Sequence, residues 1–277
     1  MLAYLAYYDV INSHIPHFVD QTWKINIAIA LVLTHITVVA VTVYLHRYAT
    51  HRAIDLHWIV ANFFQFWIWL TTGMDPEAWR AVHLNHHQYV DTARDPHSPI
   101  AEMKELGITE PLGRFLYMTR FVILLHGMMR YIRWIKVNPD KVSLHLQMLV
   151  NKGIMKERFF SPHGKLGVFV CLPLCDILLF GLPGVFIWLT QLVWIPVLAA
   201  GVINGVGHWM GYRNYPTEDF SRNIIPIGII LCGEELHNNH HQYGSSAKFS
   251  KKWWEFDIGW MYIKIFESLG LATVRRN

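Results

Sequence analysis

Three stretches of the chain are apolar over a length that could cross a lipid bilayer. They comprise residues 25–45, 166–182 and 184–204, and each is close to the twenty or so apolar residues that a spanning helix needs. Only a Leu-Pro-Gly turn separates the last two, so we expect them to form a helical hairpin. Two further runs are poorer candidates: residues 58–74 are short, and residues 115–135 carry Arg120, His126, Arg130 and Arg133. Charge at that frequency is typical of an interfacial helix.

Composition and charge support a membrane protein. Hydrophobic residues make up 53% of the chain and charged residues 16%, which is low for a soluble domain. Of the 24 Lys and Arg residues, only Lys24 precedes His46, and none lies between Leu166 and Tyr212. The positive-inside rule then places residues 47–165 and 213–276 on the cytoplasmic side. We expect a single domain over residues 1–277, all-α, with three or four transmembrane helices, interfacial helices and a cytoplasmic cap.

Histidine is the unusual residue, with 17 copies, of which eight are grouped in three clusters. The first cluster is His46-Arg-Tyr-Ala-Thr-His51, the second is His83-Leu-Asn-His86-His87, and the third is His237-Asn-Asn-His240-His241. Residues i, i+3 and i+4 share one face of a helix, so the second and third clusters should each present three imidazoles in one direction. His46 and His51 would point about 140° apart on a continuous α-helix, so we expect the helix to end between them. With two crossings in the hairpin, all three clusters lie on the same side of the membrane.

Clustered imidazoles indicate metal binding. Imidazole suits zinc, copper and iron, and eight histidines exceed what one tetrahedral zinc can use. Two metals with about four histidines each are the better match, and iron is preferred over copper. His35, inside the first apolar run, is expected to be a neutral histidine hydrogen-bonded between helices.

The three clusters also carry a family resemblance. HRYATH, HLNHH and HNNHH, with DTARDPHSP, NGVGHWMGYRNY, GEELHNNHH and FDIGWMYIKIFESLGLA, resemble the integral-membrane fatty-acid desaturases, specifically the Δ9 branch of acyl-CoA and bacterial acyl-lipid desaturases. The resemblance implies a di-iron site with nine histidine ligands and an asparagine that reaches one iron through water. These residues are His46, His51, His83, His86, His87, His208, His237, His240, His241 and Asn204. His97, in DPHSP, resembles a family residue near the site that would orient the ligands, and Asp91 and Asp95 could either do the same or cap local turns. Family members usually have two spanning helices before the first box, whereas this chain has one clear candidate.

The resemblance implies an O2-dependent enzyme that introduces a cis double bond, at Δ9, into a saturated acyl chain on phospholipid or CoA. A separate electron donor, a ferredoxin-like protein or a reductase, would be required. Lys248, Lys251 and Lys252 could bind such a donor or anionic lipid headgroups. The expected location is a bacterial inner membrane, with the active site facing the cytoplasm and no nucleic-acid partner. The alternatives are a membrane di-iron hydroxylase and a non-catalytic metal-binding protein or transporter.

Overall fold

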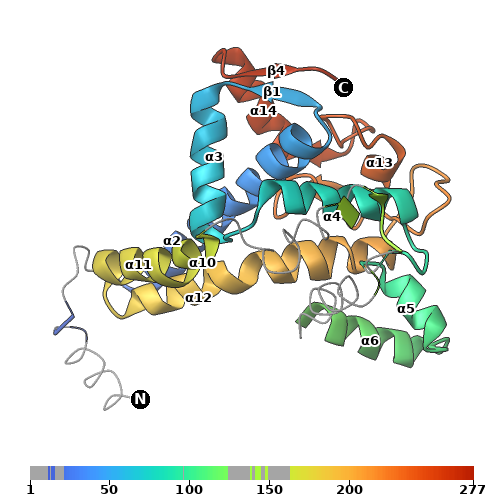
Figure 1. Cartoon of the computed structure of the whole chain (residues 1–277), viewed down its shortest axis with the longest axis horizontal. Coiled ribbons are helices and arrows are strands. Elements are labelled where there is room, and N and C mark those ends of the chain that lie inside the picture. The colour runs from blue at the N-terminus through green and yellow to red at the C-terminus, as the bar shows by residue number, and fades with distance from the viewer. Residues whose placement is uncertain are drawn as a thin grey trace.

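The described part of the molecule is mostly helical (Figure 1). This computed structural model describes residues 22–95, 97–123 and 163–277, together with positions 12, 14, 15, 138, 141–144, 147 and 148. One helix of 28 residues, Trp23–Thr50, contains α2 (Trp23–Val39) and η1 (Ala40–Thr50). Its first part exposes apolar side chains such as Leu31 and Val32, whereas nearly all of η1 is buried. The helix therefore runs from an apolar outer surface into the packed interior of the molecule.

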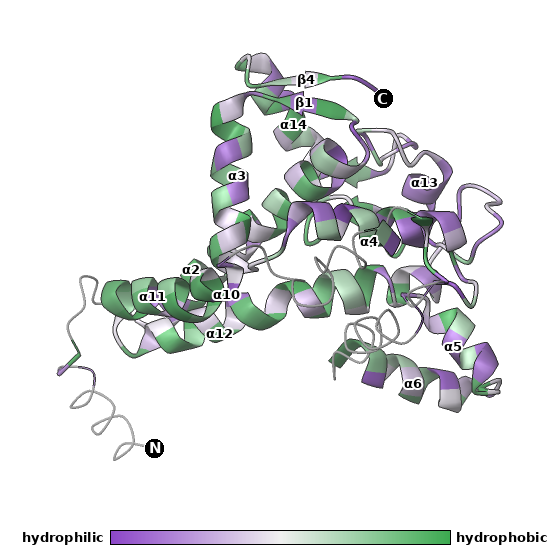
Figure 2. Ribbon diagram, viewed as in Figure 1, coloured by the Kyte–Doolittle hydropathy of each residue, from purple (hydrophilic) through white to green (hydrophobic). Residues whose placement is uncertain are grey.

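The expected hairpin is present. Its first arm consists of α10 (Gly164–Leu166), η2 (Gly167–Cys171) and α11 (Leu172–Phe180), and its second of α12 (Pro183–Ile195), η3 (Pro196–Ile203) and η4 (Val206–His208). Gly184 permits the close approach of the arms, because a Cβ atom there would lie 2.1 Å from the Asp176 carbonyl oxygen. Hydrophobic residues dominate both arms (Figure 2).

Two helices of the described chain are long and apolar enough to cross a membrane, Trp23–Thr50 and Pro183–His208. The apolar segment 166–182 forms a shorter helix, so its assignment as a third span stays a prediction. Helix α3 (Trp58–Thr71) has 14 residues and is too short to span, as expected. It runs across the direction of α12 (Figure 1) and exposes Trp58, Phe63 and Phe66. Helix α6 (Pro111–Ile123) covers the start of the second interfacial candidate, and residues 124–135 of that candidate lie outside the described chain.

Distant parts of the sequence come together near the end of η1. Helices α4 (Pro76–Tyr89), α13 (His237–Gln242) and α14 (Ile258–Ser268) lie around the end of η1, whereas α5 (Pro99–Glu105) packs on α6. Strand β1 (Ile54–Leu56) pairs antiparallel with β4 (Ala272–Val274), and β2 (Ile227–Gly228) pairs parallel with β3 (Phe256–Asp257). These short pairs correct the all-α expectation, since two or three residues are too few to give a strand pattern in the sequence.

The packing of α14 explains the histidine inside the first apolar run. The His35 Nε2 atom lies 2.9 Å from the Tyr262 hydroxyl, and their rings meet edge to face. His35 is thus hydrogen-bonded between two helices, α2 and α14, as predicted. The core beside this contact includes Val43, Phe64 and Ile263.

Candidate metal centre

All nine predicted histidines meet in two adjacent groups. Within each group, one ring nitrogen per residue lies within 4.8 Å of the others. The five-histidine group contains His46, His51, His83, His87 and His240. The four-histidine group contains His86, His208, His237 and His241. The rings of His86 and His87 lie 5.6 Å apart, so the two groups are neighbours.

Each HxxHH cluster divides between the two groups. On α4, His83 and His87 belong to the five-histidine group, while His86 belongs to the other. On α13, His240 joins the five-histidine group, while His237 and His241 join the other. Adjacent residues on a helix diverge by about 100°, so His86 and His87 cannot point at one centre. The expectation that each cluster faces one way is therefore corrected, and each short helix serves both groups.

The helix ends at Thr50, between His46 and His51 as we expected, but its last turns are not α-helical. Residues 40–50 wind as a π-helix, and the backbone N–H of His51 donates to the His46 carbonyl at 3.0 Å. This i→i+5 bond stacks residues five apart over one another, whereas an α-helix would turn them away. The two ring centroids are 4.8 Å apart. The wider winding therefore acts together with the predicted helix terminus at Thr50 to bring the two rings together.

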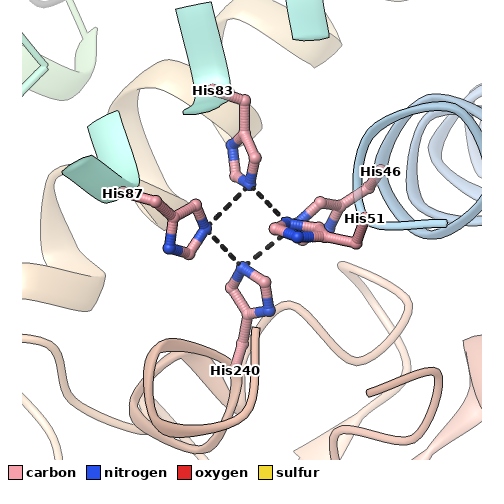
Figure 3. Close-up of side chains that lie close together, drawn as sticks. All are labelled: His46, His51, His83, His87 and His240. Atoms are coloured by element: carbon pink, nitrogen blue, oxygen red, sulfur yellow. Dashed lines mark hydrogen bonds between the residues drawn. The ribbon is translucent and has the colours of Figure 1, made fainter. Parts of the chain in front are cut away.

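Figure 3 shows the five-histidine group from η1, α4 and α13. Nε2 of His87 lies 2.9 Å from Nε2 of both His83 and His240. The Nε2 atoms of His46 and His240 are 3.1 Å apart, and those of His51 and His83 are 3.0 Å apart. All five side chains therefore present Nε2 to a common point.

Carboxylates hold four of the nine rings by the opposite nitrogen, Nδ1. Asp95 lies 2.9 Å from Nδ1 of His86, and Asp91 lies 3.0 Å from Nδ1 of His208. Asp91 and Asp95 thus each contact one of the nine predicted ligand histidines, and their role in orienting metal ligands stays a prediction. His97, the third residue of that prediction, lies beside His86 with ring centroids 5.9 Å apart, and its backbone N–H donates to Asp95.

Two further carboxylates were not predicted. Asp219 lies 2.8 Å from Nδ1 of His241, and Glu234 lies 2.6 Å from Nδ1 of His46. Glu234 belongs to GEELHNNHH, and its position three residues before His237 could have identified it as a candidate contact of the histidines. Asp219 lies 22 positions before its histidine, in a loop with no recognisable spacing.

The tautomers that these carboxylates impose fit a metal site. An ionised carboxylate accepts a hydrogen bond from Nδ1–H, so the imidazole proton stays on Nδ1 and Nε2 keeps its lone pair. Nε2 of His208 lies 2.9 Å from Nε2 of His237, while Nε2 of His86 and His241 are buried without a hydrogen-bond partner among the described residues. Lone pairs directed at one another repel, and buried unpaired acceptors are costly. A cation at the centre of each group removes both penalties.

The protonation states also suit metal binding. Burial, followed by neighbouring imidazoles, lowers the pKa of His83, His87 and His240 well below its usual value. Burial lowers the pKa of His241 to about 4, although Asp219 opposes it. These rings are therefore neutral near pH 7, as ligands must be. His86 differs: burial would lower its pKa, but the contact with Asp95 raises the net value.

Asn204 makes a local side-chain hydrogen bond. It ends η3, and its side-chain amide donates to the Ala199 carbonyl at 3.0 Å. Gly205 interrupts the winding before the 3-10 turn that carries His208. The i, i+4 relation of Asn204 and His208 is thus not that of one regular α-helix, and the water-mediated contact stays a prediction.

Comparison with known proteins decides the family, because a fatty acid desaturase model matches residues 22–261. The chain belongs to the fatty acid desaturase family. Delta-9 desaturase-like 4 protein of Arabidopsis thaliana is 30% identical over 88% of this chain and 74% of its own. Delta-9 acyl-lipid desaturase 1 of the same plant is 29% identical over 91% and 75%. Icosanoyl-CoA 5-desaturase of Limnanthes douglasii is 30% identical over 85% and 60%.

The resemblance drawn from the histidine clusters is therefore confirmed. This desaturase is an oxidoreductase that acts on fatty acyl chains. Its two long apolar helices agree with a membrane protein. The paired histidine groups provide places for a metal centre of the kind that its chemistry requires.

Asp219 offers a test of how carboxylates support this centre. We expect Asp219→Asn to weaken metal binding by about 10- to 100-fold, because a neutral amide no longer fixes the His241 tautomer. Metal titration of the metal-free protein measures the change. Glu218→Gln is the matched control, because it removes a carboxylate from the exposed neighbour and should leave affinity unchanged. Equal effects of the two substitutions would contradict the role given to Asp219.

Proposed function

We propose that this desaturase removes two hydrogens from adjacent methylenes of a saturated acyl chain, forming a cis double bond at Δ9. One O2, two electrons and two protons are consumed with the two substrate hydrogens, and two waters are released. The observation that carries the proposal is the pair of histidine groups in a chain of this family. Two relatives that are named as Delta-9 desaturases support the position of the bond.

We assign iron to both groups. Neutral imidazoles suit iron, and two bound irons would supply the O2 activation that unactivated methylenes require. His46, His51, His83, His87 and His240 would hold one ion. His86, His208, His237 and His241 would hold the other, with Asn204 reaching it through water.

Side chains around the five-histidine group keep its ligands rigid and exclude water. The Trp79 ring stacks on His83 with centroids 4.9 Å apart, and Phe249 packs on His240 at 4.8 Å. These apolar contacts limit the ways in which the imidazoles can turn. A fixed, dry site favours selective attack at one carbon because it holds the acyl chain in one register.

The acyl carrier is proposed to contain phosphate, as phospholipid and CoA both do. A cavity of about 400 Å³ has His208 in its wall and is lined by Lys104, Arg114 and Arg222. Three cations suit a phosphate-bearing group, and Trp209 and Phe220 add apolar surface. The chemistry of this wall thus fits the headgroup end of a substrate whose acyl tail reaches the histidines.

For the membrane arrangement, we propose one domain over residues 1–277 with three or four spanning helices in a bacterial inner membrane. The metal centre would face the cytoplasm. The support is the distribution of Lys and Arg, which is confined almost wholly to the stretches that carry the histidine clusters.

Expression in a host that cannot make unsaturated lipids tests the function. We expect new monounsaturated acyl chains, with the double bond located at Δ9 by mass spectrometry. The His86→Ala variant, expressed to the same level, should yield none. Hydroxylated chains in place of alkenes would overturn desaturation in favour of the hydroxylase alternative, and a bond elsewhere would overturn Δ9 alone.

A further inference from the structure

One loop, residues 246–255, connects the five-histidine group directly to the molecular surface. Its Phe249 side chain is buried, with its ring 4.8 Å from that of His240 and 5.5 Å from that of His46. Four residues later, Trp253 is 94% exposed, the largest exposure among the large hydrophobic side chains described. The inner side of this loop thus contacts the five-histidine group, and its outer side is exposed to solvent.

The outer side of this loop is basic. Lys248, Lys251 and Lys252 are its charged residues other than Glu255, and Glu255 is buried. The backbone N–H of Ala247 donates to the carbonyl of Arg276 at 2.9 Å, which adds the exposed Arg276 to the same region. An acidic surface would therefore be attracted to this loop.

The loop is held in shape from below. The Glu255 carboxylate accepts hydrogen bonds from the backbone of Lys251 and Lys252 and from the side chain of Asn239, at 2.7–3.0 Å. Asn239 directly precedes His240. The Trp254 ring packs on Tyr212 at 5.2 Å, so Trp253 alone of the two tryptophans projects freely. A prearranged surface with one exposed tryptophan is what a protein partner needs, since Trp often dominates binding energy.

The position of the loop indicates whether it binds a protein partner or a lipid surface. The bond to Arg276 places it beside the C-terminus, which Figure 1 shows well separated from the apolar tip of α11 and α12. A lipid-binding loop would be expected on the side of those helices. A location away from them favours a soluble partner.

We propose that residues 246–255 are the docking surface for the electron donor, an acidic one-electron carrier protein. This inference rests on the proposed function, which requires two electrons from outside for each double bond. The donor would be oxidised by one electron in each of two encounters. Those two electrons, with two protons from solvent and the two substrate hydrogens, reduce O2 to two waters. A donor bound on this surface would have its cofactor separated from the five-histidine group only by this loop, whose shape Phe249 and the Glu255–Asn239 contact maintain.

Binding tests the docking surface without requiring turnover. In nanodiscs, we would measure the Kd of two purified acidic carriers, a plant-type ferredoxin and the soluble domain of a cytochrome b5, with and without iron. At least one should bind, and Lys248→Glu/Lys252→Glu should weaken that binding by about tenfold or more at low salt, with a smaller effect at high salt. Trp253→Ala should also weaken it by about tenfold. The single variant Lys252→Glu should already weaken binding, whereas Arg120→Glu, an equal charge reversal on exposed α6, is its matched control and should not alter Kd.

Turnover separates donor docking from the chemistry itself. We expect the charge-reversed and Trp253→Ala variants to lose donor-driven desaturation through a higher KM for the carrier. With dithionite as reductant, both should match the wild type. Loss of binding in these variants would support docking even if the wild type made no alkene, which would count against the proposed function alone. Docking is overturned if neither carrier binds, if the variants bind normally, if dithionite-driven turnover falls equally, or if the loss occurs only in anionic-lipid nanodiscs.

Discussion

Replacing His240 with alanine should lower bound iron from two to about one per chain and abolish desaturation. His240 is fully buried, and its Nε2 atom lies 2.9 Å from Nε2 of His87 and 3.1 Å from that of His46. No other residue of α13 joins the five-histidine group. Loss of a supporting carboxylate costs about 10- to 100-fold in affinity or activity, so loss of a ligand should cost more than about 100-fold.

Iron content and product yield of the purified variant measure this outcome. His57→Asn is the matched control, because it removes a histidine outside both groups while asparagine can still cap α3. That variant should retain two irons and full activity. Normal iron content and activity in His240→Ala would show that the ligand assignment is wrong.

The contrast between His240 and its neighbours explains how far sequence alone could predict this centre. Clusters of histidine identify the ligands because the residue type and the i, i+3, i+4 spacing are both visible in the sequence. The division of each cluster between two groups depends on where the partner helices lie, and no local pattern reports that. His208 has no cluster of its own, so it was found by resemblance and not by spacing.

The winding of η1 could not be predicted for a different reason. An α-helix and a π-helix over residues 40–50 present the same apolar pattern, and only the positions of the two histidines distinguish them. Five-residue spacing is therefore a signal for π-winding wherever both residues must reach one centre. Here it was taken as the mark of a helix end.

The supporting acids show a third limit. Asp91 and Asp95 follow the second histidine cluster closely in the sequence, and they were predicted to lie near the site. Asp219 lies in a loop that folds back onto α13, where it contacts His241. Such contacts depend on the tertiary fold, and the sequence alone does not show which residues they bring together. The same holds for the paired strands β2 and β3, whose partners are separated by about thirty positions.

Breaking the buried ion pair between Arg47 and Asp257 should destabilise the protein more than any surface change. Both side chains are wholly buried, and Arg47 Nη2 lies 3.0 and 3.1 Å from the two Asp257 oxygens. The guanidinium also lies 4.0 Å above the Phe249 ring. The Asp257 carboxylate also accepts hydrogen bonds from the backbone N–H groups of Phe249 and Trp260. The ion pair therefore links η1, the loop of residues 246–255 and the start of α14.

We expect Asp257→Ala to lower the free energy of unfolding by about 3–5 kcal/mol, because it leaves a buried guanidinium without its counterion. The midpoint of thermal unfolding in detergent, with metal content held constant, reports the change. Asp55→Ala is the matched control: its pair with Arg275 is about half exposed, so its removal should cost at most about 1 kcal/mol. The double variant Arg47→Met/Asp257→Leu should recover part of the loss, since no charge is then buried. Equal shifts for Asp257→Ala and Asp55→Ala would contradict the idea that burial, and not merely pairing, makes Arg47 depend on Asp257.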